Sequence, residues 1–71
     1  MTTIVLEVQV NSDDSVGTLI TSYTDRTEAE SKYHMVLSAA AVSDKPIHSA
    51  FMIDPKGKVI RSEFYEHKQE G

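Results

Sequence analysis

The sequence contains no cysteine, so disulfide bonds cannot hold this chain together. That absence matters because a domain of about this size buries only about 60% of the surface that its unfolded chain exposes. Small domains usually offset this shortfall with disulfides, a structural metal or a partner chain. With disulfides excluded, we expect a partner chain from size alone. The lack of cysteine also suits a reducing compartment.

Other absences narrow the class of protein. The longest apolar runs, such as Ala39 to Val42, are far too short to cross a bilayer, so we expect no membrane association. The opening Met1-Thr2-Thr3 lacks a basic region followed by an apolar one, which predicts no secretory signal and a cytoplasmic location. The seven lysines and arginines are scattered and the net charge is −4, which disfavours binding to a nucleic-acid backbone.

What is present predicts two hairpins separated by one helix. Residues 3–10 are rich in β-branched residues and read as a strand. A run of turn formers, residues 11–15, leads into a second strand over residues 17–24. Alternate residues of the first strand place one apolar set on a single face: Ile4, Leu6, Val8 and Val10.

Between the hairpins, residues 25–42 show the spacing of an amphipathic helix. Asp25 is a good N-cap with Glu28 three residues later, the spacing of a capping box; Thr27 with Glu30 offers the same motif. Pro46 prevents the helix from continuing. The residues expected in the buried stripe are Ala29, Tyr33, Val36, Leu37 and Ala40.

The second hairpin joins strands over residues 47–53 and 58–67 through the turn Asp54-Pro55-Lys56-Gly57. The order strand–strand–helix–strand–strand predicts an α+β fold, ββαββ, with a four-stranded, mostly antiparallel sheet and one helix on one face. We expect residues 1–71 to form a single domain that ends in a frayed tail, residues 68–71. The way in which the two hairpins join is not readable from the sequence.

The second hairpin is apolar on both faces. If Asp54 pairs near Lys58, one face carries His48, Ala50, Met52, Ile60, Ser62 and Phe64. The other carries Ile47, Ser49, Phe51, Ile53, Val59, Arg61, Glu63, Tyr65 and His67. One helix covers one face only, and the small Ala50 and Ser62 favour the first. An apolar set is then left against water, which predicts a homo-oligomer with this interface: Phe51, Ile53, Val59 and Tyr65, alongside Val5. A register shifted by one residue would instead turn the polar residues outward.

Arg61, Glu63, Tyr65 and His67 line one face of the last strand at alternate positions and could bind an anionic or nucleotide-like ligand. The candidate ligand-binding residues are Arg61, Glu63, Tyr65, His34 and His48. Guanidinium suits phosphate, tyrosine suits base stacking and a carboxylate suits a ribose hydroxyl. The alternative is an intersubunit salt bridge between Arg61 and Glu63 beside a packed tyrosine. Because the expected register separates His48 from His67, we predict no metal site, and no cofactor is indicated. No serine lies in a nucleophile turn, so we expect no enzyme activity.

The chain also resembles a known family. The resemblance rests on Glu30-Ser31-Lys32-Tyr33-His34-Met35-Val36-Leu37, on Ala40-Ala41-Val42-Ser43, on His48-Ser49-Ala50 and on the closing Glu63-Phe64-Tyr65-Glu66-His67. On these residues the chain is similar to short, mostly uncharacterised proteins encoded by bacteriophages and prophages of gut Firmicutes. The likeness spans nearly the whole chain; the Asp-Pro-Lys-Gly turn departs from it, since an acidic-glycine turn is more frequent there. The resemblance implies a viral origin and a role in the host cytoplasm.

Together these features favour a non-enzymatic, oligomeric phage protein that captures a cyclic nucleotide or an ADP-ribose-type signal and so blunts host defence. This function rests on analogy of size and setting, not on a motif. One alternative is a structural or interaction protein, such as a minor virion component or an inhibitor of a host protein. The other is a small hydrolase that acts on the same messengers.

Overall fold

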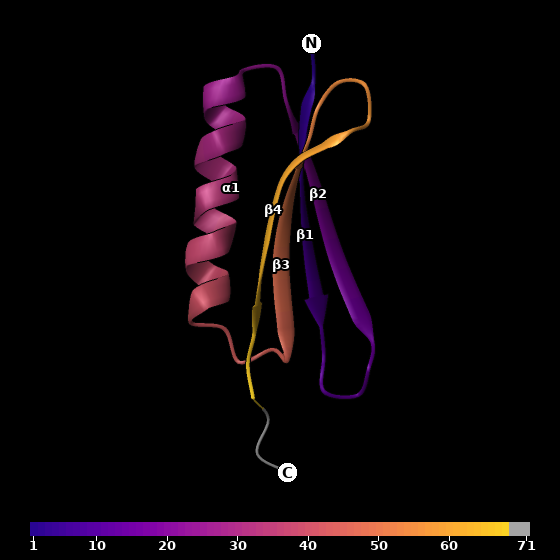
Figure 1. Cartoon of the computed structure of the whole chain (residues 1–71), viewed down its shortest axis with the longest axis vertical. Helices are drawn as coiled ribbons and strands as arrows, with labels where there is room; N and C mark the ends of the chain where they lie inside the picture. Colours follow the sequence, from indigo (N-terminus) through magenta and orange to yellow (C-terminus); the bar gives the residue numbers. More distant parts are fainter. Residues whose placement is uncertain (69–71) are drawn as a thin grey trace.

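The computed structural model describes residues 1–68, and its element order is the ββαββ predicted from the sequence. The elements are β1 (Thr3–Val10), β2 (Val16–Tyr23), α1 (Arg26–Ala41), β3 (Ile47–Ile53) and β4 (Val59–Glu66) (Figure 1). Of the tail expected at the C-terminus, only Lys68 lies within the described residues.

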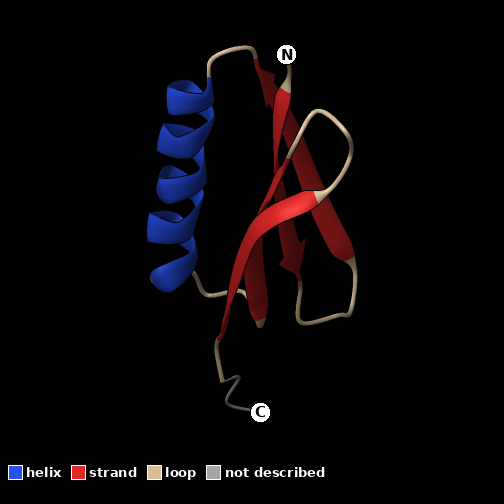
Figure 2. Cartoon of the chain, turned by 45° about the horizontal axis from the view of Figure 1, so that its top comes forward, coloured by secondary structure: helices blue, strands red, loops and turns tan. Residues whose placement is uncertain are grey.

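The four strands form one antiparallel sheet in the order β2-β1-β3-β4. The two hairpins therefore join through their first strands, β1 and β3, which pair from Ile4 with Ile53 to Val10 with Ile47. This central pairing was not readable from the sequence. It leaves β2 and β4 as the two edges of the sheet, and Figure 2 shows α1 on one side of the sheet only.

The predicted start of α1 is confirmed at Asp25. Its carboxylate accepts a hydrogen bond of 2.8 Å from the backbone N–H of Thr27, which satisfies one of the free donors of the first turn. The buried residues of α1 are also those predicted, Ala29, Tyr33, Val36, Leu37 and Ala40. The helix therefore lies on the sheet with the stripe that its spacing indicated.

The core forms where this stripe meets β1 and β3. Val5, Ala50 and Met52 lie under the helix and are at most 1% exposed. Tyr33 fills the helix side of the same cluster at 1% exposure. Ala50 lies under the helix as expected, whereas Ser62, the other small residue assigned to that face, lies on the opposite side.

A β-bulge in β4 makes the predicted face assignment wrong for the second half of that strand. Met52 pairs with Arg61 while the next residue, Ile53, pairs with Val59, so Ile60 is an extra residue. Ile60 and Arg61 both lie on the helix side, and every residue after them changes face relative to a regular hairpin. Arg61, Glu63, Tyr65 and His67 therefore face the helix side, and Ser62 and Phe64 face the opposite side.

The prediction for β1 also needs correction, because Val5 faces the helix and is buried. The opposite side of the sheet, which we call the open face, is covered by no element among residues 1–68. Its residues follow from the pairing of the strands: Ile4, Leu6, Val8, Val10, Val16, Thr18, Ile20, Ser22, Ile47, Ser49, Phe51, Ile53, Val59, Ser62, Phe64 and Glu66. The open face is thus more apolar than the sequence predicted, since it holds the whole even-numbered set of β1.

Candidate functional site

The bulge brings several polar and aromatic side chains together where β4 runs beside the helix. We call this set the α1–β4 strip: Tyr33, His34, Arg61, Glu63, Tyr65 and His67. Arg61, Glu63 and Tyr65 alternate along β4 and face the helix side, while Tyr33 and His34 come from the middle of α1. Four of the five ligand-binding residues predicted from the sequence are therefore neighbours on this strip.

Arg61 lies over the ring of Tyr33, with its guanidinium carbon 5.2 Å from the ring centroid. At this distance the positive charge is attracted to the face of the ring. His34 meets the same tyrosine edge to face, with ring centroids 5.7 Å apart. Two residues correspond to about 200° around a helix, so His34 and Lys32 point to opposite sides of α1. Because the charge of Lys32 acts on Glu7 of β1, Lys32 is on the β1 side and His34 is on the β4 side.

At the C-terminal end of β4, the strip ends in a stacked pair of rings. Tyr65 and His67 lie 6.4 Å apart between centroids with only 13° between their planes. His67 is held in turn by the helix, because its Nε2–H donates to the carbonyl of Ala40 at 2.7 Å. Tyr65 remains 39% exposed, so part of this residue is accessible from solvent.

Charges on the strip act on the buried tyrosine. Burial raises the pKa of Tyr33, the negative charge of Glu63 raises it further, and the positive charge of Arg61 partly offsets both. The Tyr33 hydroxyl is therefore neutral and can act as a hydrogen-bond donor over the whole physiological range. Exposed Arg61 is the cation available to an anionic group on the strip.

The remaining predicted residue, His48, lies deeper, in a polar cluster between β1 and β3. Its Nε2 is 2.5 Å from a carboxylate oxygen of Glu7, and the side-chain amide of Gln9 donates to that same oxygen at 3.1 Å. His48 is only 4% exposed and therefore does not reach the surface of the α1–β4 strip. Its Nδ1 is buried without a hydrogen-bond partner among the residues that the structure describes.

The charge state of Glu7 determines the tautomer of His48. Burial alone would raise the pKa of Glu7, but hydrogen bonds from His48 and Gln9, with the charges of His48 and Lys32, together hold it below its usual value. Glu7 is thus an acceptor at neutral pH, so His48 Nε2 carries the proton. In the neutral ring the unpartnered Nδ1 is then a bare lone pair.

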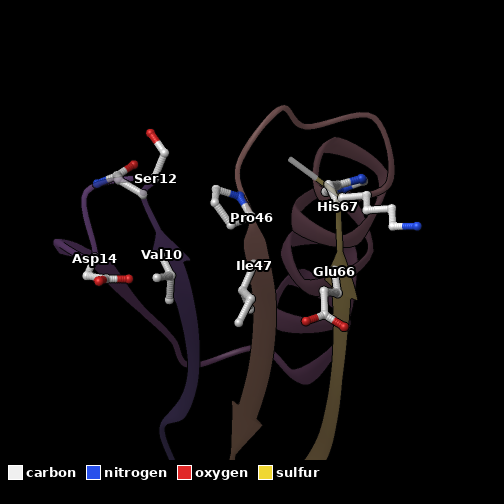
Figure 3. Close-up of a pocket in the computed structure, with 9 residues that line it drawn as sticks. Val10, Ser12, Asp14, Pro46, Ile47, Glu66 and His67 are labelled. Carbon is white, nitrogen blue, oxygen red and sulfur yellow. The ribbon is translucent and has the colours of Figure 1, made fainter. Parts of the chain in front are cut away.

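A hollow of about 820 Å³ lies at the end of the sheet where β1 ends and β3 begins, and it shares His67 with the strip. Figure 3 shows Val10, Ile47 and Glu66 side by side on three neighbouring strands, with Asp14 beyond Val10. Its apolar floor is flanked by two carboxylates, and Lys68 contributes a positive charge. This balance disfavours a phosphate and makes the hollow a poorer nucleotide site than the strip.

Within residues 1–68, no three His, Cys, Asp or Glu side chains gather where they could share an ion. The bulge corrects the expected placement of the histidines, because His48 and His67 lie on the same side of the sheet. They are nevertheless engaged separately, one with Glu7 and the other with Ala40.

Sequence reasoning misses the Glu7–His48 pair, because it leaves to solvent the side of β1 that carries Val5 and Glu7, whereas the helix covers that side. The available signal was the unbroken run Ile4-Val5-Leu6, which indicates a strand that is apolar on both sides before Glu7.

The described helix is too short and too polar to span a membrane. No family model, curated protein or solved structure matches this chain.

Proposed function

We propose that this chain is the subunit of a homo-oligomeric, non-enzymatic binding protein whose open face is the subunit interface. The observation that carries the proposal is the composition of that face. In the described strands its side chains are aliphatic or aromatic except for Thr18, Ser22, Ser49, Ser62 and Glu66. A contiguous apolar surface of this kind on a small protein marks an interaction site.

The size of the open face suits a second copy. Strands about 4.8 Å apart and about 3.3 Å per residue give a four-stranded, eight-residue patch of about 500 Å² in projection. Corrugation by side chains increases the accessible area, so two such faces approach the roughly 1,200–2,000 Å² of a stable interface. Packed sheets lie about 10 Å apart, which would bury Ile20 and Phe64, both 67% exposed in the single chain.

Two of the residues predicted for the interface, Val5 and Tyr65, lie on the helix side and do not belong to the proposed one. Phe51, Ile53 and Val59 belong to the open face, whereas Tyr65 lies on the helix side with the α1–β4 strip. The strip therefore faces away from the proposed partner, and each subunit would carry its own ligand site on the outer surface. The interpretation of Arg61 and Glu63 as a pair buried between subunits does not fit this arrangement.

For the ligand, we propose a nucleotide-like small molecule bound on the α1–β4 strip. Arg61 supplies the cation for a phosphate, Tyr65 an exposed ring for a base and Glu63 an acceptor for a ribose hydroxyl. In the setting implied by the family resemblance, the ligand is a cyclic nucleotide or ADP-ribose-type immune messenger. Sequestering that messenger in the host cytoplasm would make the protein an anti-defence sponge of a phage.

The oligomer is tested by measuring molar mass in solution by light scattering. Phe64→Glu places a charge in the open face at a side chain that contributes little to the single-chain core. We expect it to lower the mass of the assembly. Met35→Glu is the matched control, because Met35 is 62% exposed on the helix and lies outside the open face. Equal masses for wild type and both variants would contradict the proposed interface.

Ligand capture is tested by thermal unfolding with a panel of cyclic nucleotides and cyclic ADP-ribose isomers. A ligand at 100 times its Kd stabilises the native state by about 2.7 kcal/mol. For a domain of this size that raises Tm by about 10–20 °C. Arg61→Ala should abolish the shift, whereas Arg26→Ala, at the other arginine, should retain it.

The same samples separate the alternatives. No shift with any ligand, together with a stoichiometric host or virion protein recovered from infected cells, would favour an interaction protein over a sponge. Conversion of the ligand, followed by chromatography, would favour a hydrolase. A shift with unchanged ligand supports capture.

A further inference from the structure

The two edges of the sheet are protected very differently. An edge strand exposes unpaired backbone groups, and proteins usually blunt it with charges, proline, a bulge or a covering element. The β4 edge has a bulge at Ile60 and the charged residues Arg61, Glu63 and Glu66. It therefore has two of the usual safeguards.

The β2 edge has none of them. Its sequence, Val-Gly-Thr-Leu-Ile-Thr-Ser-Tyr, contains no charged residue and no proline. It pairs with β1 residue for residue from Val16 to Tyr23 without a bulge. Figure 1 shows β2 on the side of the sheet away from α1, and no strand lies beyond it among residues 1–68.

The hairpin closure determines which backbone groups point outward. The N–H of Asn11 donates to the carbonyl of Ser15 at 2.8 Å. Since hydrogen-bonded pairs alternate along an antiparallel ladder, the odd-numbered residues of β2 bond to β1. The residues whose N–H and C=O groups point away from the sheet are Val16, Thr18, Ile20 and Ser22.

We propose that β2 pairs antiparallel with β2 of a second copy, about a twofold axis beside Leu19. In this register Val16 lies opposite Ser22 of the other copy, and Thr18 lies opposite Ile20. Among the registers with twofold symmetry, this one gives all four outward residues a partner. A shift of one β2 strand along the other leaves some of them unpaired. The two sheets then join into one sheet of eight strands.

The chemistry of β2 fits a copy of itself. Leu19 is 54% exposed on the helix side and meets Leu19 of the other copy across the axis, in a pair whose side chains lie close. Each chain carries a net charge of −4, but the absence of charge on β2 keeps like charges away from this contact. A copy is also self-complementary by symmetry, as a twofold interface requires.

This interface is separate from the open-face interface and compatible with it. A twofold axis perpendicular to the sheet keeps both helices on one side and places the two open faces next to each other. Packing of two such eight-stranded sheets through their open faces would give four chains. The edge contact does not depend on the open-face contact, so each can fail without the other.

Proline at an outward position tests the edge contact with little damage to the fold. Thr18→Pro removes an N–H that points away from β1, and proline is tolerated at such positions of edge strands. Met35→Lys is the control, because Met35 is 62% exposed on the helix and lies outside both proposed interfaces. Leu19→Lys, which sets two like charges side by side, is the second variant should Thr18→Pro unfold.

Molar mass by light scattering, with circular dichroism as the check of folding, decides the outcome. We expect four chains for wild type and for Met35→Lys, and two chains for Thr18→Pro, Leu19→Lys or Phe64→Glu. Combining Thr18→Pro with Phe64→Glu should give single chains. If wild type is a dimer, the variants show which contact forms it. A dimer that Phe64→Glu dissociates, but that folded Thr18→Pro and Leu19→Lys retain, contradicts edge pairing alone. A dimer that Thr18→Pro and Leu19→Lys dissociate, but that Phe64→Glu retains, contradicts the open-face proposal alone. A wild-type monomer contradicts both proposals.

Discussion

Replacing Glu7 tests how much the polar cluster beneath the helix contributes to stability. Glu7→Ala leaves the Nε2–H of His48 without its acceptor in a residue that is 4% exposed. An unsatisfied buried donor costs about 1–3 kcal/mol. Glu7→Gln keeps an acceptor oxygen for His48 but loses the charge, and a neutral hydrogen bond is about 1 kcal/mol weaker than a charged one. We therefore expect Glu7→Gln to be clearly more stable than Glu7→Ala.

The same cluster gives a pH dependence whose sign follows from the pKa of Glu7. The folded-state pKa of Glu7 lies below the ordinary value of 4.5. At a pH between these two values, the unfolded chain therefore binds more protons than the folded chain does. The stabilisation by ionised Glu7 is complete above 4.5 and is lost as pH falls through the folded-state pKa. The free-energy difference between wild type and Glu7→Gln should accordingly shrink in acid.

Urea unfolding followed by circular dichroism, at one fixed chain concentration because self-association shifts apparent stability, measures both effects. Glu28→Gln, at an exposed helix carboxylate, is the control and should change stability by no more than about 0.5 kcal/mol. The reasoning fails if Glu7→Gln and Glu7→Ala lose the same free energy at neutral pH. It also fails if the gap between wild type and Glu7→Gln is the same at neutral pH and well below 4.5.

Two local features give further predictions, both measurable by calorimetry as a shift in Tm. Asp25→Ala removes the acceptor for the Thr27 N–H and should cost about 1 kcal/mol, whereas Asp25→Asn should retain most of the cap; equal losses would contradict the capping role. Gly57 adopts φ of +87°, so Gly57→Ala should cost about 1 kcal/mol even though a Cβ there meets nothing within 4 Å. An unchanged Tm for Gly57→Ala would mean that the turn relaxes to another conformation.

The features predicted correctly are those determined by residues close together in the sequence. The spacing of apolar residues and the cap at Asp25 define α1 within one turn, and β1 and β3 have the bounds that their composition indicated. The turn at residues 54–57 likewise follows from proline and glycine. These signals need no knowledge of the rest of the chain.

The strand order and the bulge depend on contacts between distant segments. Nothing in β4 alone indicates that Ile60 would be an extra residue, since Ile60 and Arg61 fit a regular alternation equally well. The face assignment of Arg61, Glu63 and Tyr65 therefore failed as a group. Their mutual alternation was right, so these three residues were predicted to share one face but were placed on the wrong side of the sheet.

The extra residue in β4 determines which side chains reach each face of the sheet. If Ile60 paired with Met52 in a regular ladder, Arg61 and Glu63 would point toward the open face and Phe64 would lie under the helix. Deleting Ile60 would instead remove the bulge and leave Arg61 opposite Met52, so both faces of β4 would keep their side chains. Natural variants of such a protein that lack one residue between the turn and Arg61 should therefore present the same two surfaces.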